Sequence, residues 1–448
     1  MPKGPALANL TSMRIDVGYT EHLEGTLDPP SSKNYTTRYL LAAALADGDS
    51  IVRRPARSDD ADALVRCLVD LGAVIREETD DANGDRCLHV TGFGRRPKQP
   101  GTLNPGNAGA VARFLMGTAA LLPEVRFETD HADSLGQRPH GELLDALEQL
   151  GATTESRQGG CFPLTIRGGQ LHGGLVRISG ARSSQYLTSI LFLAPLIGED
   201  VEIEVIDSLV SKPLITTTLE VLESAGIEVA AAADLMHFKI AAGQSYRPGE
   251  YRVNGDYPSA AALLSAAVIT RSEVTVRRLY EDSQGERAVI DVLQRMGAQL
   301  SYDGSQVVVN GHAGLRGIEF NGDMATDMVL VMLPLAAMAE GESRFYGIGN
   351  LRIKECDRIA VPVRELGRLG VDCEEGEDEI IVRGRPSGYE GGIELGTHND
   401  HRVAQMLTIM GLQCRKGIVL NDAETVAKSY PGFYQDLTRL GARIGERS

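Results

Sequence analysis

The sequence predicts an α/β protein that is built from six repeats of a two-helix unit. A nearly apolar segment with a polar opening recurs roughly every 75 residues, and the openings are near Ser32, Asn107, Ser184, Ser259, Thr326 and Asn399. A second helical segment follows each one and ends at a glycine: Gly72, Gly151, Gly226, Gly297, Gly370 and Gly441. Strand-like runs, such as residues 51–53, 87–90 and 273–276, alternate with these helices. Such alternation is typical of α/β folds.

The first helix of each repeat is apolar on all sides, which predicts that it is buried. We expect these inner helices to be surrounded by sheets and by the second, amphipathic helices. The closing glycines fit this scheme, because a helix that turns directly into a strand ends on a residue with positive φ, which glycine adopts without strain.

The start of each inner helix is a candidate anion site. The first N–H groups of a helix have no partner within it, and the peptide dipoles place about half a positive charge there. If the six starts converge, they form a pocket for anions.

The length predicts two domains, since 448 residues exceed the size at which a single core stops growing. Turn-rich stretches at residues 28–34 and 253–260 are the expected crossovers. We therefore expect an N-terminal lobe of residues 31–253, with repeats one to three. Residues 254–448 form the C-terminal lobe with repeats four to six, and residues 1–30 return to it. Two connecting strands of this kind act as a hinge.

Composition excludes several classes of protein. The net charge of −16 argues against nucleic acid or an anionic membrane as the main partner. The six cysteines include no C-x-x-C pair, and the nine histidines show no metal-ligand spacing, so we expect reduced thiols and no metal. The first 16 residues lack the apolar core of a signal peptide, and the longest apolar run, residues 187–197, is shorter than the ~20 residues that span a bilayer. These features predict a soluble, cytoplasmic protein.

Basic residues gather at or near the repeat starts. They are Lys33, Arg38, Arg113, Arg138, Lys354, Arg358, Arg402 and Lys428. Because a cation at a helix N-terminus opposes the dipole, this placement indicates a ligand with two or more anionic groups. The alternative is a set of solvated or ion-paired surface side chains. Lys354 and Arg358 are four residues apart and are expected to share a helical face.

Polar and acidic residues accompany these cations. Ser183, Ser184 and Gln185 open the third inner helix, and Ser211 precedes its outer partner. Serines here are most often only helix caps, although hydroxyl and amide groups also suit a phosphate. Asp327 at the fifth start has the same simple alternative, stabilisation of the dipole.

These motifs together resemble the family of 5-enolpyruvylshikimate-3-phosphate (EPSP) synthase over essentially the whole chain. The motifs are Ser32-Lys33 with Arg38, N-A-G-x-x-x-R from Asn107 to Arg113, R-P-x-G at Arg138, S-S-Q at Ser183, S-K-P at Ser211, K-E-x-D-R at Lys354 and N-D-H-R at Asn399. The resemblance implies a fold of two lobes, each built from three repeats, which close around the substrates.

The resemblance also implies the reaction, in which the enolpyruvyl group of phosphoenolpyruvate moves to the 5-hydroxyl of shikimate 3-phosphate and phosphate is released. Shikimate 3-phosphate is expected to contact Lys33, Asn34, Arg38, Ser183, Ser184, Gln185, Ser211, Asp327, Asn350 and Lys354. Phosphoenolpyruvate is expected to contact Lys33, Gly109, Arg113, Arg138, Gln185, Arg358, Arg402 and Lys428. Asp327, Glu355 and Lys33 are the expected catalytic residues. No cofactor or metal is implied, and a monomer is expected.

Some positions depart from the family pattern and favour an alternative. Asn34 stands where the synthase usually has serine, Ala110 where it has threonine, and Leu214 where it has tyrosine. Lys33-Asn34 instead resembles the sister family, UDP-N-acetylglucosamine enolpyruvyl transferase. That family usually has a cysteine where this chain has Asp133. The S-S-Q, K-E-x-D-R and N-D-H-R motifs favour the synthase over this alternative. A non-catalytic repeat scaffold is the third hypothesis.

The departures at Asn34 and Ala110 predict reduced sensitivity to glyphosate, which the EPSP synthase family binds in place of phosphoenolpyruvate. Both residues alter the expected wall of that pocket. We expect Ala110→Thr combined with Asn34→Ser to increase inhibition, measured as the glyphosate concentration that halves phosphate release. Equal inhibition of the two forms would contradict this expectation.

Overall fold

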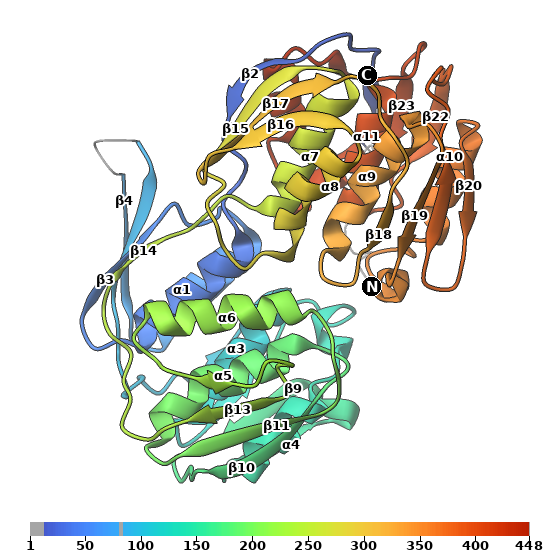
Figure 1. Cartoon of the computed structure of the whole chain (residues 1–448). Coiled ribbons are helices and arrows are strands. Elements are labelled where there is room, and N and C mark those ends of the chain that lie inside the picture. The colour runs from blue at the N-terminus through green and yellow to red at the C-terminus, as the bar shows by residue number, and fades with distance from the viewer. Residues whose placement is uncertain (1–12, 80–83, 448) are drawn as a thin grey trace, which may run out of the picture. The chain divides into compact units, whose positions relative to one another are not determined.

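The computed structural model describes residues 13–79 and 84–447. The chain forms two compact units (Figure 1). Unit 1 comprises residues 1–30, 255–281 and 285–448, and unit 2 comprises residues 31–254 and 282–284. The predicted α/β fold with six repeats is confirmed, since each unit contains three sheets and three inner helices.

Unit 2 contains repeats one to three. Its inner helices are α1 (Lys33–Leu45), α3 (Gly109–Ala119) and α5 (Ser184–Ile197), and its outer helices are α2 (Asp59–Asp70), α4 (Gly141–Gln149) and α6 (Lys212–Ser224). Its strands are β3 (Asp49–Arg53), β4 (Val74–Thr79), β5 (Arg86–Thr91), β6 (Thr102–Leu103), β7 (Val125–Phe127), β8 (Thr153–Arg157), β9 (Cys161–Arg167), β10 (Gly174–Gly180), β11 (Val201–Leu209), β12 (Ala230–Ala231), β13 (His237–Ile240) and β14 (Glu250–Arg252).

Unit 1 contains repeats four to six. Its inner helices are α7 (Tyr257–Ile269), α9 (Thr326–Met338) and α11 (His401–Gly411), and its outer helices are α8 (Val289–Arg295), α10 (Ala360–Arg368) and α12 (Phe433–Arg439). Its strands are β1 (Ile15–Val17), β2 (Glu24–Leu27), β15 (Glu273–Arg277), β16 (Ala298–Tyr302), β17 (Gln306–His312), β18 (Glu319–Asn321), β19 (Glu342–Tyr346), β20 (Asp372–Glu375), β21 (Ile380–Arg383), β22 (Ile393–Gly396), β23 (Ile418–Asn421) and β24 (Ile444–Glu446). Unit 1 also contains the short 3-10 helices η4 (Gly349–Ile353) and η5 (Ala423–Lys428), which include the predicted site residues Asn350 and Lys428.

All six sheets have four strands and the same pairing pattern. The first two strands are parallel and the remaining pairs are antiparallel, as in β6-β7-β9-β8 and β18-β19-β21-β20. In four repeats the inner helix connects the two parallel strands, which forms a β-α-β crossover. One supersecondary unit therefore recurs six times.

Two strands belong to a different unit from the helix that directly follows them in the chain. β2 comes directly before α1 but pairs with β15 of unit 1, where Glu24 is opposite Glu273. β14 comes directly before α7 but pairs with β3 of unit 2, where Tyr251 is opposite Val52. β1 lies between β23 and β24, so the N-terminal segment contributes to two sheets of unit 1.

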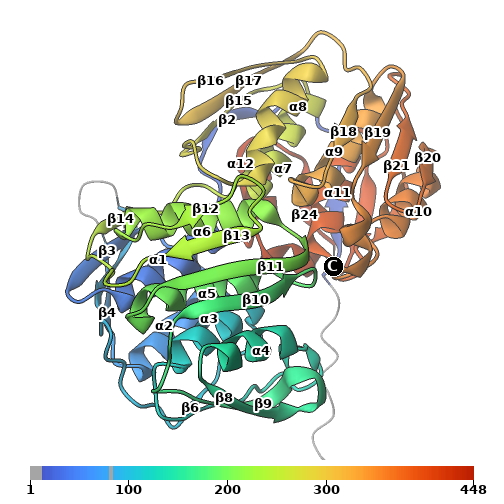
Figure 2. The ribbon, with the colours of Figure 1, turned by 60° about the horizontal axis from the view of Figure 1, so that its bottom comes forward.

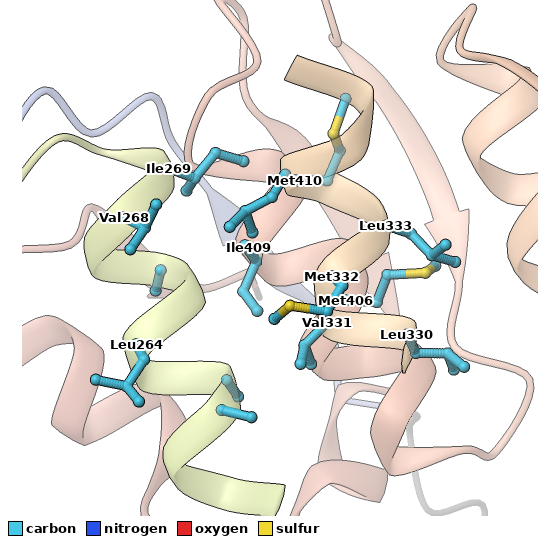
Figure 3. Close-up of a cluster of buried hydrophobic side chains, with 14 of the residues drawn as sticks. Leu264, Val268, Ile269, Leu330, Val331, Met332, Leu333, Met406, Ile409 and Met410 are labelled. Atoms are coloured by element: carbon cyan, nitrogen blue, oxygen red, sulfur yellow. The ribbon is translucent and has the colours of Figure 1, made fainter. Parts of the chain in front are cut away.

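Each inner helix packs against its own sheet, and this placement explains its apolar sequence. In unit 1, α7 contacts β15 and β17, α9 contacts β19 and β21, and α11 contacts β23. Every residue of α7 is buried. Side chains of all three helices, including Val268, Met332 and Ile409, fill the space between them (Figure 3). The predicted burial of the inner helices is confirmed here.

Unit 2 differs in how its helices contact one another. α3 packs against α5, whereas α6 contacts both α1 and α5. Figure 2 shows β10, β11 and β13 of the third sheet beside α5. The outer helix α6 is therefore also part of the support for α1, on which Lys33 and Arg38 lie.

The turns that close the repeats have the backbone conformation expected from their glycines. Gly72, Gly151, Gly226, Gly297, Gly370 and Gly441 all have positive φ, between 78° and 104°. Some helix starts differ from the prediction by two residues. α7 begins at Tyr257 instead of Ser259, because the Asp256 side chain caps the helix and Pro258 fits its first turn.

Within the described ranges, none of the helices is both long and apolar enough to cross a membrane.

The contact between α3 and α5 leads to a prediction about stability. A Cβ on Gly117 would lie 2.8 Å from both the backbone oxygen and the Oγ of Ser189. We expect Gly117→Ala to lower the free energy of unfolding by about 1–3 kcal/mol, because the two helices would have to separate. Urea denaturation measures this change.

Gly367→Ala is the matched control, since Gly367 is also helical and a Cβ there meets nothing within 4 Å. This variant should gain about 0.5–1 kcal/mol from helix propensity. Equal effects of the two substitutions would show that the α3–α5 contact is not tight.

Candidate functional site

The predicted site residues form two clusters, one in each unit. The Arg113 cluster of unit 2 comprises Gly109, Arg113, Arg138, Ser183 and Gln185. The Arg358 cluster of unit 1 comprises Asp327, Glu355, Arg358, Asp400, Arg402 and Lys428.

The Arg113 cluster lies at the start of α3. Arg113 Nη1 donates to Gln185 Oε1 at 2.6 Å and to Ser183 Oγ at 3.4 Å. A Cβ on Gly109 would lie 3.0 Å from Arg138 Nη1 and 3.9 Å from Arg113 Nη1. Glycine at this position therefore leaves room for two guanidinium groups beside one helix start.

Arg113 is held by neutral groups, and Arg138 beside it is exposed. Among the residues that the structure describes, no carboxylate lies within ion-pair distance of Arg113 or Arg138. Arg113 Nε donates to Nδ1 of the buried His140 at 3.5 Å. Burial, together with the charges of Arg113 and Arg138, lowers the pKa of His140 to about 3 and keeps it neutral. The cluster thus has uncompensated positive charge, which favours an anion.

Two basic residues of the first repeat have protein partners. Lys33 Nζ lies 3.0 Å from Asp60 Oδ2 of α2. Arg38 is buried, donates from Nε to Thr218 Oγ1 at 2.9 Å, and donates from Nη1 to the carbonyl oxygen of Asn34 at 3.0 Å. Burial lowers the pKa of Arg38 to about 10. Arg38 therefore connects α1 to α6, and Lys33 remains half-exposed.

Of the three predicted serines of the third repeat, Ser183 has the simple capping role, whereas Ser211 makes no side-chain cap hydrogen bond. Ser183 Oγ accepts from the backbone N–H of Gln185 at 3.3 Å and caps α5. Ser184 is buried in the first turn of α5. Ser211 precedes α6 with a φ of 54°, in the left-handed region.

Three of the six inner-helix starts already bind a side chain of the chain itself. Side chains of the chain itself cap α5, α7 and α11, through Ser183, Asp256 and Asp400 respectively. For α1, α3 and α9, no side-chain cap occurs within the described part of the chain. The latter three starts therefore keep more of their first N–H groups for a ligand than the capped ones do.

The Arg358 cluster is organised around one buried guanidinium group. Only 3% of the Arg358 side chain is exposed. Its Nη1 donates to Asp327 Oδ1 at 3.1 Å, and its Nη2 donates to Glu355 Oε2 at 2.9 Å. Its Nε donates to Asp400 Oδ2 at 2.7 Å. Three carboxylates from three separate segments thus meet at Arg358, which excludes exposed surface ion pairing as the explanation for this residue.

Two further cations border the same carboxylates. Arg402 Nη2 lies 3.6 Å from Asp327 Oδ2, and Arg402 Nη1 donates to Gln405 Oε1 at 3.1 Å. The buried Arg402 Nε has no hydrogen-bond partner among the described residues. Lys428 Nζ donates to Glu355 Oε1 from the end of η5.

These cations keep the two candidate acid–base groups ionised. Burial alone would raise the pKa of Asp327, but Arg402 and Arg358 outweigh it and hold the pKa well below its usual range. Burial would also raise the pKa of Glu355, yet Arg358 and Lys428 lower it to about 2. Both side chains are therefore carboxylates at neutral pH in this arrangement.

The predicted helical face of Lys354 and Arg358 is wrong. η4 ends at Ile353 and α10 begins at Ala360, so residues 354–359 are not helical. Asp357 Oδ1 accepts from the backbone N–H groups of Ile359 and Ala360, at 2.9 and 3.0 Å, and so starts the helix after itself.

Lys354 and Asn350 lie in the segment of the chain that leads to Arg358. Lys354 is exposed and helps to lower the pKa of Asp327 through its charge. Asn350 lies in η4, and its buried Oδ1 has no partner within the residues described.

Several residues of the site were not among the predicted ones. Asp400 holds Arg358 and caps α11, and His140 and Gln405 contact the two site arginines Arg113 and Arg402. A signal for Asp400 was available, because an aspartate directly before an apolar helix is typical of an N-cap. The partners of Arg113 and Arg402 depend on packing and leave no such signal.

Over the described ranges, no group of three or more His, Cys, Asp or Glu side chains is placed to hold a metal ion.

Comparisons with known proteins agree with this fold. Two solved structures of EPSP synthase from Acinetobacter baumannii superimpose on this chain. One has a TM-score of 0.86 and 26% identity and covers 98% of this chain and 100% of its own, and the other has a TM-score of 0.84.

Sequence comparison gives the family. The family model of EPSP synthase (3-phosphoshikimate 1-carboxyvinyltransferase) matches residues 17–437. The 3-phosphoshikimate 1-carboxyvinyltransferase of Deinococcus radiodurans is 44% identical over 423 residues, which is 94% of each chain. That of Methanocaldococcus jannaschii is 34% identical over 427 residues, covering 95% of this chain and 97% of its own. The chain therefore belongs to the EPSP synthase family, as the resemblance predicted.

The lowered pKa of Glu355 predicts how stability depends on pH. Because the pKa in the folded state is about 2 and the ordinary value is 4.5, ionised Glu355 stabilises the fold above about pH 4.5. This contribution is lost as the pH falls towards about 2. Between about pH 5 and pH 2, the wild type should therefore lose more free energy of unfolding than Glu355→Gln, as measured by urea denaturation. Parallel pH profiles would show that Glu355 gains nothing from Arg358 and Lys428.

Proposed function

We propose that the chain transfers the enolpyruvyl group of phosphoenolpyruvate to the 5-hydroxyl of shikimate 3-phosphate and releases inorganic phosphate. Membership of the EPSP synthase family supports this activity. The main structural support for this activity is the Arg358 cluster, where the carboxylates of Asp327 and Glu355 lie among cations. Addition to an enol requires groups that take and give protons and cations that balance the substrate charges.

Phosphoenolpyruvate brings a phosphate and a carboxylate, and unpaired cations suit both. In unit 2, Arg113 and Arg138 lack carboxylate partners among the described residues. In unit 1, Arg402 Nε is buried without a partner in the described part of the chain. Each charge-assisted hydrogen bond to the substrate contributes about 1.5–3 kcal/mol. The proposed contacts are Lys33, Gly109, Arg113, Arg138, Gln185, Arg358, Arg402 and Lys428.

Shikimate 3-phosphate needs contacts for one phosphate, one carboxylate and two or more hydroxyl groups. Free N–H groups at the start of α1 and the nearby Lys33 suit an anionic group. The unpaired Oδ1 of Asn350 is an acceptor for a hydroxyl. The proposed contacts are Lys33, Asn34, Arg38, Ser183, Ser184, Gln185, Ser211, Asp327, Asn350 and Lys354.

Asp327 and Glu355, with Lys33, are the proposed catalytic residues. The 5-hydroxyl oxygen bonds to C2 of the enol while C3 gains a proton. Loss of a proton from that methyl group and departure of phosphate then restore the double bond. Asp327 and Glu355 exchange these protons with the hydroxyl and with the carbon. Glu355 can give a proton once Lys428 and Arg358 turn to the anionic groups of phosphoenolpyruvate, because its pKa then rises from about 2.

We further propose that the enzyme acts in the cytoplasm as a monomer and without a cofactor. The described cysteines Cys67, Cys87, Cys161, Cys356, Cys373 and Cys414 are free thiols, which suits a reducing compartment.

A phosphate-release assay with each acceptor tests the proposed function. With phosphoenolpyruvate present, shikimate 3-phosphate should support turnover and UDP-N-acetylglucosamine should not. Turnover with the nucleotide sugar alone would assign the chain to the sister activity. Absence of turnover with both would favour a non-catalytic scaffold.

Replacement of one carboxylate tests the proposed chemistry. Glu355→Gln should lower turnover by about 10²–10⁴-fold and leave substrate affinity largely intact, because an amide cannot exchange the proton. Steady-state kinetics and calorimetric binding of both substrates measure the two quantities. Glu379→Gln is the control, since Glu379 forms an ion pair with Arg344 and is not among the site residues. If Glu355→Gln lowers stability but leaves turnover normal, Glu355 acts only as an ion-pair partner and not in proton transfer.

A further inference from the structure

The turn directly before α11 contains two consecutive left-handed residues that are not glycine. His398 has a φ of 54° and Asn399 a φ of 57°. Asparagine and histidine occur in this region more often than most residues do, but every residue with a Cβ has a steric cost of roughly 1–2 kcal/mol there. Contacts of the folded chain must therefore hold His398 in this conformation.

Glu365 of α10 provides these contacts. Its side chain is only 3% exposed, and its Oε1 lies 2.9 Å from His398 Nε2. Its Oε2 accepts from Arg368 Nη1 at 2.7 Å and from the backbone N–H of Gly396 at 3.4 Å. Arg364 Nη2 also faces the imidazole, at 3.1 Å from Nε2. One buried carboxylate thus holds both the end of β22 and the strained turn that follows it.

The same turn sets the position of Asp400, whose side chain is fully buried. Asp400 Oδ1 accepts from the backbone N–H of Arg402 at 2.8 Å and from that of Val403 at 3.4 Å. Its Oδ2 accepts from Arg358 Nε at 2.7 Å. A rotation of the backbone at His398 would therefore displace the carboxylate that orients Arg358.

We propose that Glu365 and His398 are positioning residues for the Arg358 cluster. Their contact keeps residues 398 and 399 left-handed, and the turn then fixes Asp400 against Arg358. Neither residue touches a substrate in this scheme. The effect on phosphoenolpyruvate binding rests on the proposed function, whereas the effect on Asp400 does not.

Two substitutions at one position test this proposal. His398→Ala removes the imidazole but keeps the cost of positive φ, whereas His398→Gly removes both. We expect His398→Ala to raise the KM for phosphoenolpyruvate about three- to tenfold, and His398→Gly to stay within about twofold of the wild type. His89→Ala is the matched control, because His89 also pairs with a glutamate, Glu78, at 3.3 Å in unit 2.

Hydrogen exchange of the Arg402 and Val403 amides reports on the Asp400 cap without any substrate. These amides should exchange about three- to tenfold faster in His398→Ala than in the wild type, and His398→Gly should exchange like the wild type. Equal values for wild type and His398→Ala, or equal impairment of the two variants, would overturn the proposal. If the wild type lacks synthase activity, the proposed function fails and the exchange rates still decide the role of the turn.

Discussion

Much of the candidate site in unit 1 depends on the buried guanidinium group of Arg358. Its five N–H groups form a rigid planar fork. They donate to Asp327 at the start of α9, to Glu355 three residues before Arg358, and to Asp400 at the start of α11. Burial alone would lower the pKa of Arg358, yet Asp327 and Asp400 raise it above its ordinary value. The charge is permanent, and it keeps Asp327 and Glu355 ionised in this arrangement.

The two clusters handle charge in opposite ways. Unit 1 brings cations and carboxylates together, so it holds groups that can exchange protons as well as groups that bind anions. Unit 2 places Arg113 and Arg138 beside one helix start, and the partners of Arg113, including Gln185 and His140, are neutral. The positive charge of unit 2 therefore favours an anion, whereas Lys428 in unit 1 is already paired with Glu355 and, in the proposed function, a substrate would compete for it.

The sequence predicted the features that depend on local composition. Apolar segments identified the inner helices, and Gly72 and the equivalent glycines identified the turns of positive φ. Features that depend on distant partners were not predictable. Arg358 and Asp400 are separated by 42 positions, and their contact follows from the packing of α9, α10 and α11. Lys354 and Arg358 were expected to share a helical face because they are four residues apart. This spacing does not reveal that Asp357 accepts from the backbone N–H groups of Ile359 and Ala360, so that the helix begins only after it.

The placement of β1, β2 and β14 has a consequence for biosynthesis. Unit 2 has all six of its helices and all of its strands within residues 31–254, so a ribosome completes this segment before most of unit 1 exists. The last sheet of unit 1 instead joins Ile15 to Leu420 and Glu446. β1 is therefore synthesised long before its partners β23 and β24. We expect unit 2 to fold before unit 1.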